Sequence, residues 1–254
     1  MRIISLCPSL TELVFALGRG RDLLACTKFC VHPEGGVKRA LKVGGTKDPR
    51  IDDIVSLSPD IVLMNDEENR QEDYQALIGR GVRCHSTMPR TIAETASMVR
   101  SIAGALDRSE RGEEIAEEIE RRAARVDAAA VSRDPVSFAY IIWTKPWMSV
   151  NRDTFAHALL SNAGGVNVFA DREERYPEVS LEDMRATRPD LLLLCTEPYP
   201  FKSVDAVDLS IDLDIPIDRI VLADGEYLSW HGSRTPDGID YAESLVLGEL
   251  PLQS

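Results

Sequence analysis

Two segments of this chain place acidic side chains at matching positions 130 residues apart. The segment IDDIVSLSPDIVLMNDE at 51–67 aligns without a gap with LEDMRATRPDLLLLCTE at 181–197. Asp52 matches Glu182, and each lies at the predicted start of a helix, where the helix dipole stabilises a carboxylate. Two explanations are open. Either both acids reflect the ordinary preference for acidic residues at helix starts, or the two acids make equivalent contacts with a symmetric partner protein.

A second pair of equivalent acids, Glu67 and Glu197, follows a short apolar run in each copy. Ligands of open α/β sheets bind beyond the carboxyl ends of the strands. These two acids are predicted to face a ligand or, together with Glu68, to dock a partner. The alternative is that they are solvated loop acids.

Metal chemistry finds little support in the sequence. Cys26, Cys30 and His32 form a C-x3-C-x-H pattern, and Cys84-His85 is a further candidate, but neither matches the usual spacing of zinc ligands. We predict no metal site and no intrinsic cofactor. The cysteines are odd in number and scattered, which predicts free thiols instead of a disulfide framework.

Enzyme signatures are also absent from the sequence. It has no G-x-S-x-G elbow, no P-loop and no G-x-G-x-x-G after the first strand. Asp153 and His157 are spaced to share one helix face, but no nucleophile stands beside them. The sequence therefore predicts a protein that is not an enzyme.

The composition excludes several classes of partner. A net charge of −13 argues against nucleic acid, which needs a basic surface. No apolar run approaches the roughly 20 residues of a membrane span. The start, MRIISLCPS, lacks the apolar stretch of a secretory signal. It predicts a cytoplasmic protein as the chain is written, or a periplasmic or cell-surface one if a leader has been removed.

Strand and helix patterns alternate along the chain, which predicts parallel sheets covered by helices. Residues 107–131 differ, because they lack proline and carry a narrow apolar stripe of Ile115, Ile119 and Val126. We predict two related α/β lobes, at 1–106 and 132–254, joined by this single long helix. The first helix is expected to begin with a capping box formed by Ser9 and Glu12 in SLTE.

Three motifs, RIISLCPSLTELVFALG, VGGTKDPRIDDIVSLSPDIVL and YPEVSLEDMRATRPDLLLL, resemble the helical-backbone substrate-binding proteins of metal-chelate ABC importers. Vitamin B12 binders are the most similar branch, with siderophore and haem binders nearby. The resemblance covers nearly the whole chain and keeps the order of the motifs. It implies two Rossmann-like lobes on a long backbone helix, with the ligand in the cleft between them.

The resemblance also implies which side chains bind the ligand. Aromatic residues match cleft positions of the B12 binders, and His32 is a candidate contact to a chelated metal, with His231 as an alternative. The predicted ligand-binding residues are Phe29, His32, Trp143, Trp147, Tyr176 and Trp230. The sequence departs from that branch at Thr46, where a tryptophan is expected. This departure favours a smaller or more polar ligand than cobalamin.

The same resemblance implies a partner and a function. One acid on each lobe pairs with arginines of the importer's permease, and Asp52 and Glu182 match these acids, with Glu67 and Glu197 as a second pair. We predict a monomer that binds a corrinoid or a ferric chelate and delivers it to an ABC importer. The alternatives are a cytoplasmic binding or sensing protein without a transporter, and a cleft enzyme acting on a tetrapyrrole-like compound.

Overall fold

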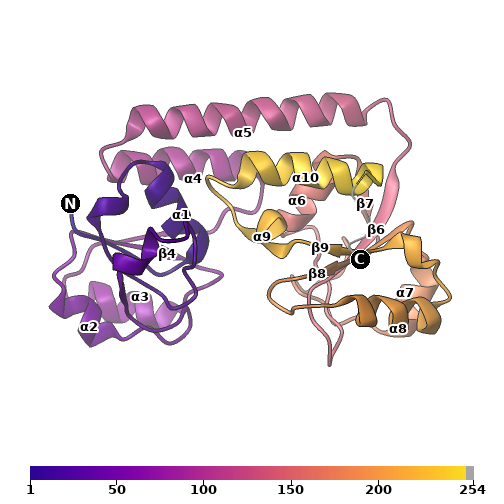
Figure 1. Ribbon diagram of the computed structural model, residues 1–254, viewed down its shortest axis with the longest axis horizontal. Coiled ribbons are helices and arrows are strands. Elements are labelled where there is room, and N and C mark those ends of the chain that lie inside the picture. The colour runs from indigo at the N-terminus through magenta and orange to yellow at the C-terminus, as the bar shows by residue number, and fades with distance from the viewer. Residues whose placement is uncertain (250–254) are drawn as a thin grey trace. The chain divides into compact units, whose positions relative to one another are not determined.

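A computed structural model describes residues 1–249, which divide into two compact α/β units (Figure 1). Unit 1 comprises residues 1–89, 93–118 and 231–234. Unit 2 comprises residues 90–92, 119–230 and the chain from 235 onward. Within the described residues, no helix combines the length and the apolar character that crossing a membrane requires. The domain boundaries expected from sequence stay a prediction.

Unit 1 is built on a five-stranded parallel sheet in the order β3-β2-β1-β4-β5. Its strands are β1 (Ile3–Ser5), β2 (Leu23–Cys26), β3 (Leu41–Lys42), β4 (Ile61–Asn65) and β5 (Cys84–Thr87). Its helices are α1 (Pro8–Ala16), α2 (Ile51–Ser56), α3 (Gln71–Ile78), most of α4 (Ile92–Ala105) and the first part of α5 (Ser109–Ala130). One face of the sheet packs on α2 and α3 through Ile4, Val62, Ile54 and Leu77.

Unit 2 is built on a four-stranded parallel sheet in the order β7-β6-β8-β9. Its strands are β6 (Val136–Ile141), β7 (Gly165–Asn167), β8 (Leu191–Cys195) and β9 (Ile220–Ala223). Its helices are the second part of α5, α6 (Phe155–Asn162), α7 (Leu181–Thr187), α8 (Ser203–Leu213), α9 (Gly225–Ser229) and α10 (Thr235–Leu247). The predicted fold class, two parallel α/β lobes, is confirmed.

The sequence repeat corresponds to a structural repeat. Helix α2 and strand β4 begin at Ile51 and Ile61, and helix α7 and strand β8 begin 130 residues later, at Leu181 and Leu191. Both strands are buried at every position, as predicted for parallel strands covered on two faces. Each lies beside the first strand of its own sheet, since β4 pairs with β1 and β8 pairs with β6.

The repeated Pro-Asp before each strand has a structural role. The Asp60 carboxylate accepts a hydrogen bond from the backbone N–H of Arg2 at 2.7 Å, just before β1. The Asp190 carboxylate accepts one from the backbone N–H of Ser137 at 3.0 Å, in β6. Each aspartate therefore joins the start of its strand to the start of the neighbouring strand. The repeated aspartate is therefore explained by its structural role in the sheet and requires no role in binding.

Helix α5 belongs to unit 1 up to Glu118 and to unit 2 from Ile119. Its predicted apolar stripe is buried, with Ile119 and Val126 fully covered. In unit 1 it packs tightly on α4, because a Cβ on Gly112 would lie 2.1 Å from the Ala103 Cβ. The helix is therefore anchored within each unit by different contacts.

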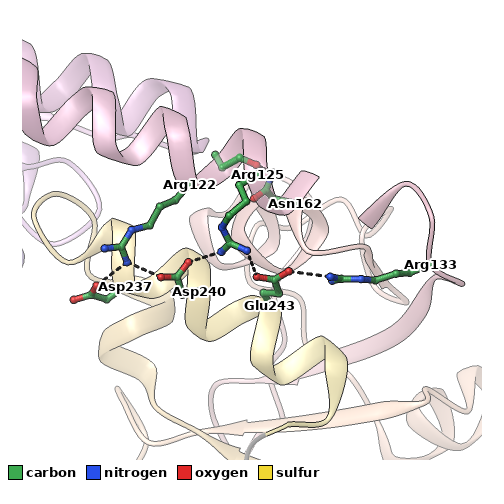
Figure 2. Close-up of polar contacts among 8 residues, drawn as sticks. Arg122, Arg125, Arg133, Asn162, Asp237, Asp240 and Glu243 are labelled. Carbon is green, nitrogen blue, oxygen red and sulfur yellow. Dashed lines mark hydrogen bonds and ion pairs between the residues drawn. The ribbon is translucent and has the colours of Figure 1, made fainter. Parts of the chain in front are cut away.

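In unit 2, helix α5 and the turn after it are tied to α10 by alternating charges (Figure 2). Arg122 pairs with Asp237 and Asp240, Arg125 with Asp240 and Glu243, and Arg133 with Glu243, at 2.6–3.1 Å. Burial acts to raise the pKa of Glu243, but the hydrogen bonds and charges of Arg125 and Arg133 outweigh it and lower that pKa. Such networks fix geometry more firmly than isolated surface pairs.

The capping box expected at Ser9 and Glu12 is wrong. Helix α1 begins at Pro8, and Cys7 is its N-cap without a side-chain hydrogen bond. Proline is favoured at the first helical position because its missing N–H needs no partner there. Glu12 instead receives two hydrogen bonds from the Arg234 guanidinium, at 2.8 and 3.0 Å.

Candidate ligand-binding site

Four aromatic rings gather beyond the carboxyl ends of β6 and β8 in unit 2. Trp143 meets Tyr199 edge-on with ring centres 5.4 Å apart, and Tyr199 lies 4.5 Å from Phe201. Trp147 stacks on Phe201 at 6.0 Å with nearly parallel planes. Phe201 is buried, whereas Trp143 is 40% exposed. The cluster thus combines a buried ring, Phe201, with a partly exposed ring, Trp143, that is accessible to a ligand.

Backbone hydrogen bonds hold the loop that carries the two tryptophans. Met148 donates to the Trp143 carbonyl at 3.1 Å, and Ile142 donates to the Met148 carbonyl at 2.9 Å. Val179 donates to the Trp147 carbonyl at 3.0 Å, which ties the loop to the segment that carries Tyr176. The rings are therefore held on ordered backbone.

The structure brings the predicted Trp143 and Trp147 into one cluster, together with Tyr199 and Phe201, which the sequence analysis missed. The sequence contained a signal for these two residues. They follow β8 just as the tryptophans follow β6, and because parallel strands end at the same edge of a sheet, the two loops are expected to meet. Tyr176 lies half-buried on a neighbouring segment, with the Arg175 guanidinium 5.8 Å from its ring centre.

Trp230 and Glu197 are joined by a hydrogen bond in unit 2. The indole Nε1 donates to the Glu197 carboxylate at 3.0 Å, and Trp230 is 6% exposed. A buried indole N–H requires such a partner. Trp230 therefore offers a ligand little surface of its own, and Glu197 uses one carboxylate oxygen inside its unit. The binding role of Trp230 and the docking role of Glu197 stay predictions.

In unit 1, Phe29 follows β2 and is 51% exposed. The Lys28 ammonium lies 5.0 Å from the centre of its ring. Gly45 lets the ring approach, since a Cβ there would lie 3.1 Å from it. His32 is half-buried in the same loop. Of the two predicted ligand-binding residues in unit 1, Phe29 is therefore the more exposed.

Two buried asparagines organise the carboxyl edge of the unit 1 sheet. Asn65 ends β4, and its Oδ1 accepts the backbone N–H groups of Glu67 and Glu68 at 3.0 and 3.1 Å. Its Nδ2 lies 3.1 Å from His231 Nε2, which belongs to the returning segment of unit 1. Sequence reasoning missed Asn65, although an amide at the end of an apolar strand is a visible signal.

Asn69 joins this edge to the loop that carries Thr46. Its Nδ2 donates to the carbonyls of Leu6 and Thr46, both at 3.0 Å. Thr46 is 7% exposed and contributes no ring at the position where a tryptophan was expected. Burial raises the pKa of Glu68, against the opposing effect of the Lys47 charge. The carboxyl edge of the unit 1 sheet is therefore lined by polar groups at this position, whereas that of the unit 2 sheet carries the aromatic cluster.

Two of the four predicted docking acids, Asp52 and Glu182, lie in the first turns of their helices, as expected. Asp52 is the second residue of α2, with a side chain that is 90% exposed and ion-paired with Arg80. Glu182 is the second residue of α7 and is exposed. Glu67 is half-buried, and its carbonyl accepts from Lys47 at 2.6 Å. Asp52 and Glu182 therefore present equivalent carboxylates, one on each unit.

The Asp153–His157 combination weighed in the sequence does not form a catalytic pair. Asp153 is engaged by Arg90 and Arg175 at 3.1 and 2.8 Å. His157 lies beside Ser161 and Asn167, and burial lowers its pKa. Across residues 1–249, no group of three or more His, Cys, Asp or Glu side chains is arranged to hold a metal ion.

Comparison with known proteins agrees with this architecture. Residues 3–207 match the family described as periplasmic binding protein. A vitamin B12-binding protein of Vibrio cholerae serotype O1 is 26% identical over 191 residues, 75% of this chain and 69% of that protein. The crystal structure of the periplasmic vitamin B12-binding protein of Vibrio cholerae superposes with a TM-score of 0.85, at 22% identity over 98% of both chains.

A periplasmic haem-binding protein from Roseiflexus sp. RS-1 has a TM-score of 0.84 and 25% identity, over 98% of this chain and 99% of that chain. The resemblance to two-lobed substrate-binding proteins inferred from the motifs is confirmed. The chain therefore belongs to the periplasmic binding protein family and is a binding protein, not an enzyme.

Proposed function

We propose that this protein binds a metal chelate, either a corrinoid or an iron chelate such as haem, and delivers it to an ABC importer. The observation that carries the proposal is the aromatic cluster beyond β6 and β8, in a chain whose relatives are named for vitamin B12 and haem. Flat macrocycles suit such sites, which are apolar with a few polar groups.

Each unit has candidate ligand contacts at the carboxyl edge of its own sheet. Unit 2 supplies the rings of Trp143 and Tyr199, with Trp147 and Tyr176 beside them, and Trp230 supports the loop through Glu197. Unit 1 supplies the exposed ring of Phe29 and the imidazole of His32. Aromatic rings contribute large contact areas with few rotatable bonds, which suits a rigid ligand.

The polar edge of unit 1 argues for a ligand that is less bulky or more polar than cobalamin on that side. Thr46 has no aromatic ring to stack on a corrin, and its hydrogen bonds with Asn69 and Glu68 make this position polar. We expect cobinamide, which lacks the nucleotide loop of cobalamin, or haem to bind at least as tightly as cobalamin itself.

Delivery would use the equivalent carboxylates on α2 and α7. Asp52 and Glu182, each the second residue of its helix, would each pair with an arginine on one half of a two-fold symmetric permease, with Glu67 and Glu197 as further candidates. Charge-assisted pairs of this kind fix register and partner choice. The protein would act as a monomer outside the cytoplasm, in the periplasm or at the cell surface, which accords with the names of its relatives.

Titration of the purified protein tests the proposal. Aquocobalamin, cobinamide, haemin and a ferric hydroxamate are added separately, while tryptophan fluorescence and the visible spectrum of the chelate are recorded. We expect saturable one-to-one quenching at micromolar affinity or better with at least one chelate. Quenching by none of the four would refute a chelate-binding function.

A further inference from the structure

Two buried cysteines of unit 1, Cys26 and Cys30, are four residues apart and contact the same lysine side chain. Cys26 is the last residue of β2, and Cys30 ends the tight turn that follows, where its N–H donates to the Thr27 carbonyl at 3.2 Å. Each thiol affects the pKa of the other, which raises the pKa of Cys26 and lowers that of Cys30. Both are free cysteines, exposed by 0% and 2%.

Polar hydrogen-bonding groups surround this thiol pair. Thr11 Oγ1 donates to Cys30 Sγ at 3.1 Å, and Thr27 Oγ1 lies at the same distance from it. The Lys42 ammonium donates to Cys26 Sγ at 3.2 Å and to the Cys30 carbonyl at 3.0 Å. Hydroxyl donors and a cation stabilise a thiolate, which is the reactive form of cysteine.

The other cysteines have different surroundings. Burial raises the pKa of Cys7 and of Cys195 to about 12, and that of Cys84 to about 11. The interactions with Cys26, Thr11 and Thr27 oppose burial at Cys30 and lower its pKa below the ordinary value of a thiol. One sulfur of the pair is thus favoured as a thiolate, and the other three thiols serve as internal comparisons.

We propose that Cys26 and Cys30 form a redox-active dithiol, stabilised by Lys42, that closes to an intramolecular disulfide when a disulfide oxidant such as glutathione disulfide is present. Lys42 is exposed but the two thiols beneath it are buried, so the reaction requires local opening of the loop at this side chain. Oxidising compartments outside the cytoplasm favour disulfides, and the family of this chain is described as periplasmic.

The exchange is balanced in two steps. The Cys30 thiolate attacks one sulfur of glutathione disulfide, forms a mixed disulfide and releases one glutathione thiolate. The Cys26 thiol then gives its proton to solvent, and its sulfur displaces the second glutathione from Cys30. Two protein thiols are oxidised to one disulfide, and one glutathione disulfide is reduced to two molecules of glutathione.

The disulfide would close a small ring around Thr27, Lys28 and Phe29. Because Phe29 is the exposed ring of unit 1, oxidation would restrict the loop that presents it. This consequence for ligand binding depends on the proposed function. Formation of the disulfide does not, so the two proposals can fail separately.

Peptide mapping after oxidation distinguishes the possible pairings. The native chain is incubated with glutathione disulfide, denatured, alkylated with iodoacetamide and digested with trypsin, which cleaves after Lys28 between the two cysteines. A Cys26–Cys30 disulfide joins peptide 22–28 to peptide 29–38. A Cys7–Cys30 disulfide would instead join peptide 3–19 to peptide 29–38.

We expect the 22–28/29–38 pair, with a loss of two hydrogens from the intact mass. We also expect several-fold slower oxidation in Lys42→Met and an unchanged rate in Cys84→Ser. Alkylation of both Cys26 and Cys30, a linkage through Cys7, or glutathione retained on Cys84 alone would overturn the proposal. Circular dichroism melting of Lys42→Met ensures that the slower rate belongs to a folded protein.

Discussion

The indole Nε1 of Trp230 lies 3.0 Å from the carboxylate of Glu197, although the two residues are 33 positions apart. Trp230 is almost fully buried, and Glu197 is the second residue after the end of β8. The hydrogen bond fixes the end of α9 to the edge of the sheet where the aromatic rings gather. A residue expected to touch the ligand is therefore also a structural support.

Replacing Trp230 should cost stability. Trp230→Phe removes the indole donor from a half-buried carboxylate, which we expect to lower the free energy of unfolding by about 1–3 kcal/mol. Urea denaturation followed by far-UV circular dichroism measures this change. Trp143→Phe makes the same substitution at a 40% exposed ring and should stay within about 0.5 kcal/mol of wild type. Equal effects of the two variants would contradict the supporting role.

Two glycines in neighbouring helices should respond to alanine in opposite ways. In Gly112→Ala the new methyl meets the Ala103 Cβ on α4, and we expect a loss of about 1–2 kcal/mol despite better helix propensity. Gly104 is an exposed residue of α4 with its nearest atom 3.9 Å away, so Gly104→Ala should gain about 0.5–1 kcal/mol. Thermal unfolding of both variants measures the difference. A stable Gly112→Ala would show that the close α4–α5 contact is wrong.

The helix start at Ser180 predicts a defined pH dependence. Hydrogen bonds from the Ser180 side chain and backbone, and then from Arg172, lower the pKa of Asp183 from 3.8 to about 2. A pKa lowered by folding stabilises the protein above its unfolded value, and this stabilisation is lost as pH falls through the folded value. Asp183→Asn should therefore be less stable than wild type at neutral pH, with the difference fading between about pH 4 and pH 2.

Denaturant unfolding of wild type and Asp183→Asn at several pH values measures that difference. Glu174→Gln, a change at an exposed acid outside the helices, serves as the control and should follow wild type throughout. A deficit of Asp183→Asn that persists unchanged to pH 2 would rule out ionisation as its cause.

The docking proposal predicts a variant that binds but does not deliver. Asp52→Asn combined with Glu182→Gln removes both equivalent charges and should leave chelate affinity unchanged, while uptake of the same chelate by the source cell falls at least tenfold. Glu174→Gln, a change at another exposed acid of unit 2, is the charge control and should keep uptake. Normal uptake by the double variant would refute docking through these acids.

The sequence alone predicted the elements that depend on local pattern. The apolar runs at Ile61 and Leu191 and the helix around Ile119 were found because burial on two faces and a narrow stripe are visible in the residue order. The repeat was also found, but the roles of Asp60 and Asp190 were not. Their partners, Arg2 and Ser137, lie more than 50 positions away, and only the sheet brings them together.

The site was less predictable than the fold for the same reason. Trp143 and Trp147 were selected from their own loop, whereas Tyr199 and Phe201 join them only through the pairing of β6 with β8. The start of α1 was misplaced because two local rules competed, and proline at the first helical position outweighed serine as a cap.

Equilibrium dialysis tests chelate binding by this family member most directly. Wild type and the double variant Phe29→Ala/Trp143→Ala are dialysed against whichever of aquocobalamin, cobinamide, haemin or ferric hydroxamate quenches the fluorescence most. Val131→Ala, at an 84% exposed apolar residue, is the control. We predict one chelate per chain for wild type and Val131→Ala, and at least tenfold weaker retention by the double variant. Equal retention by the double variant, or no retention by any protein, would contradict the account.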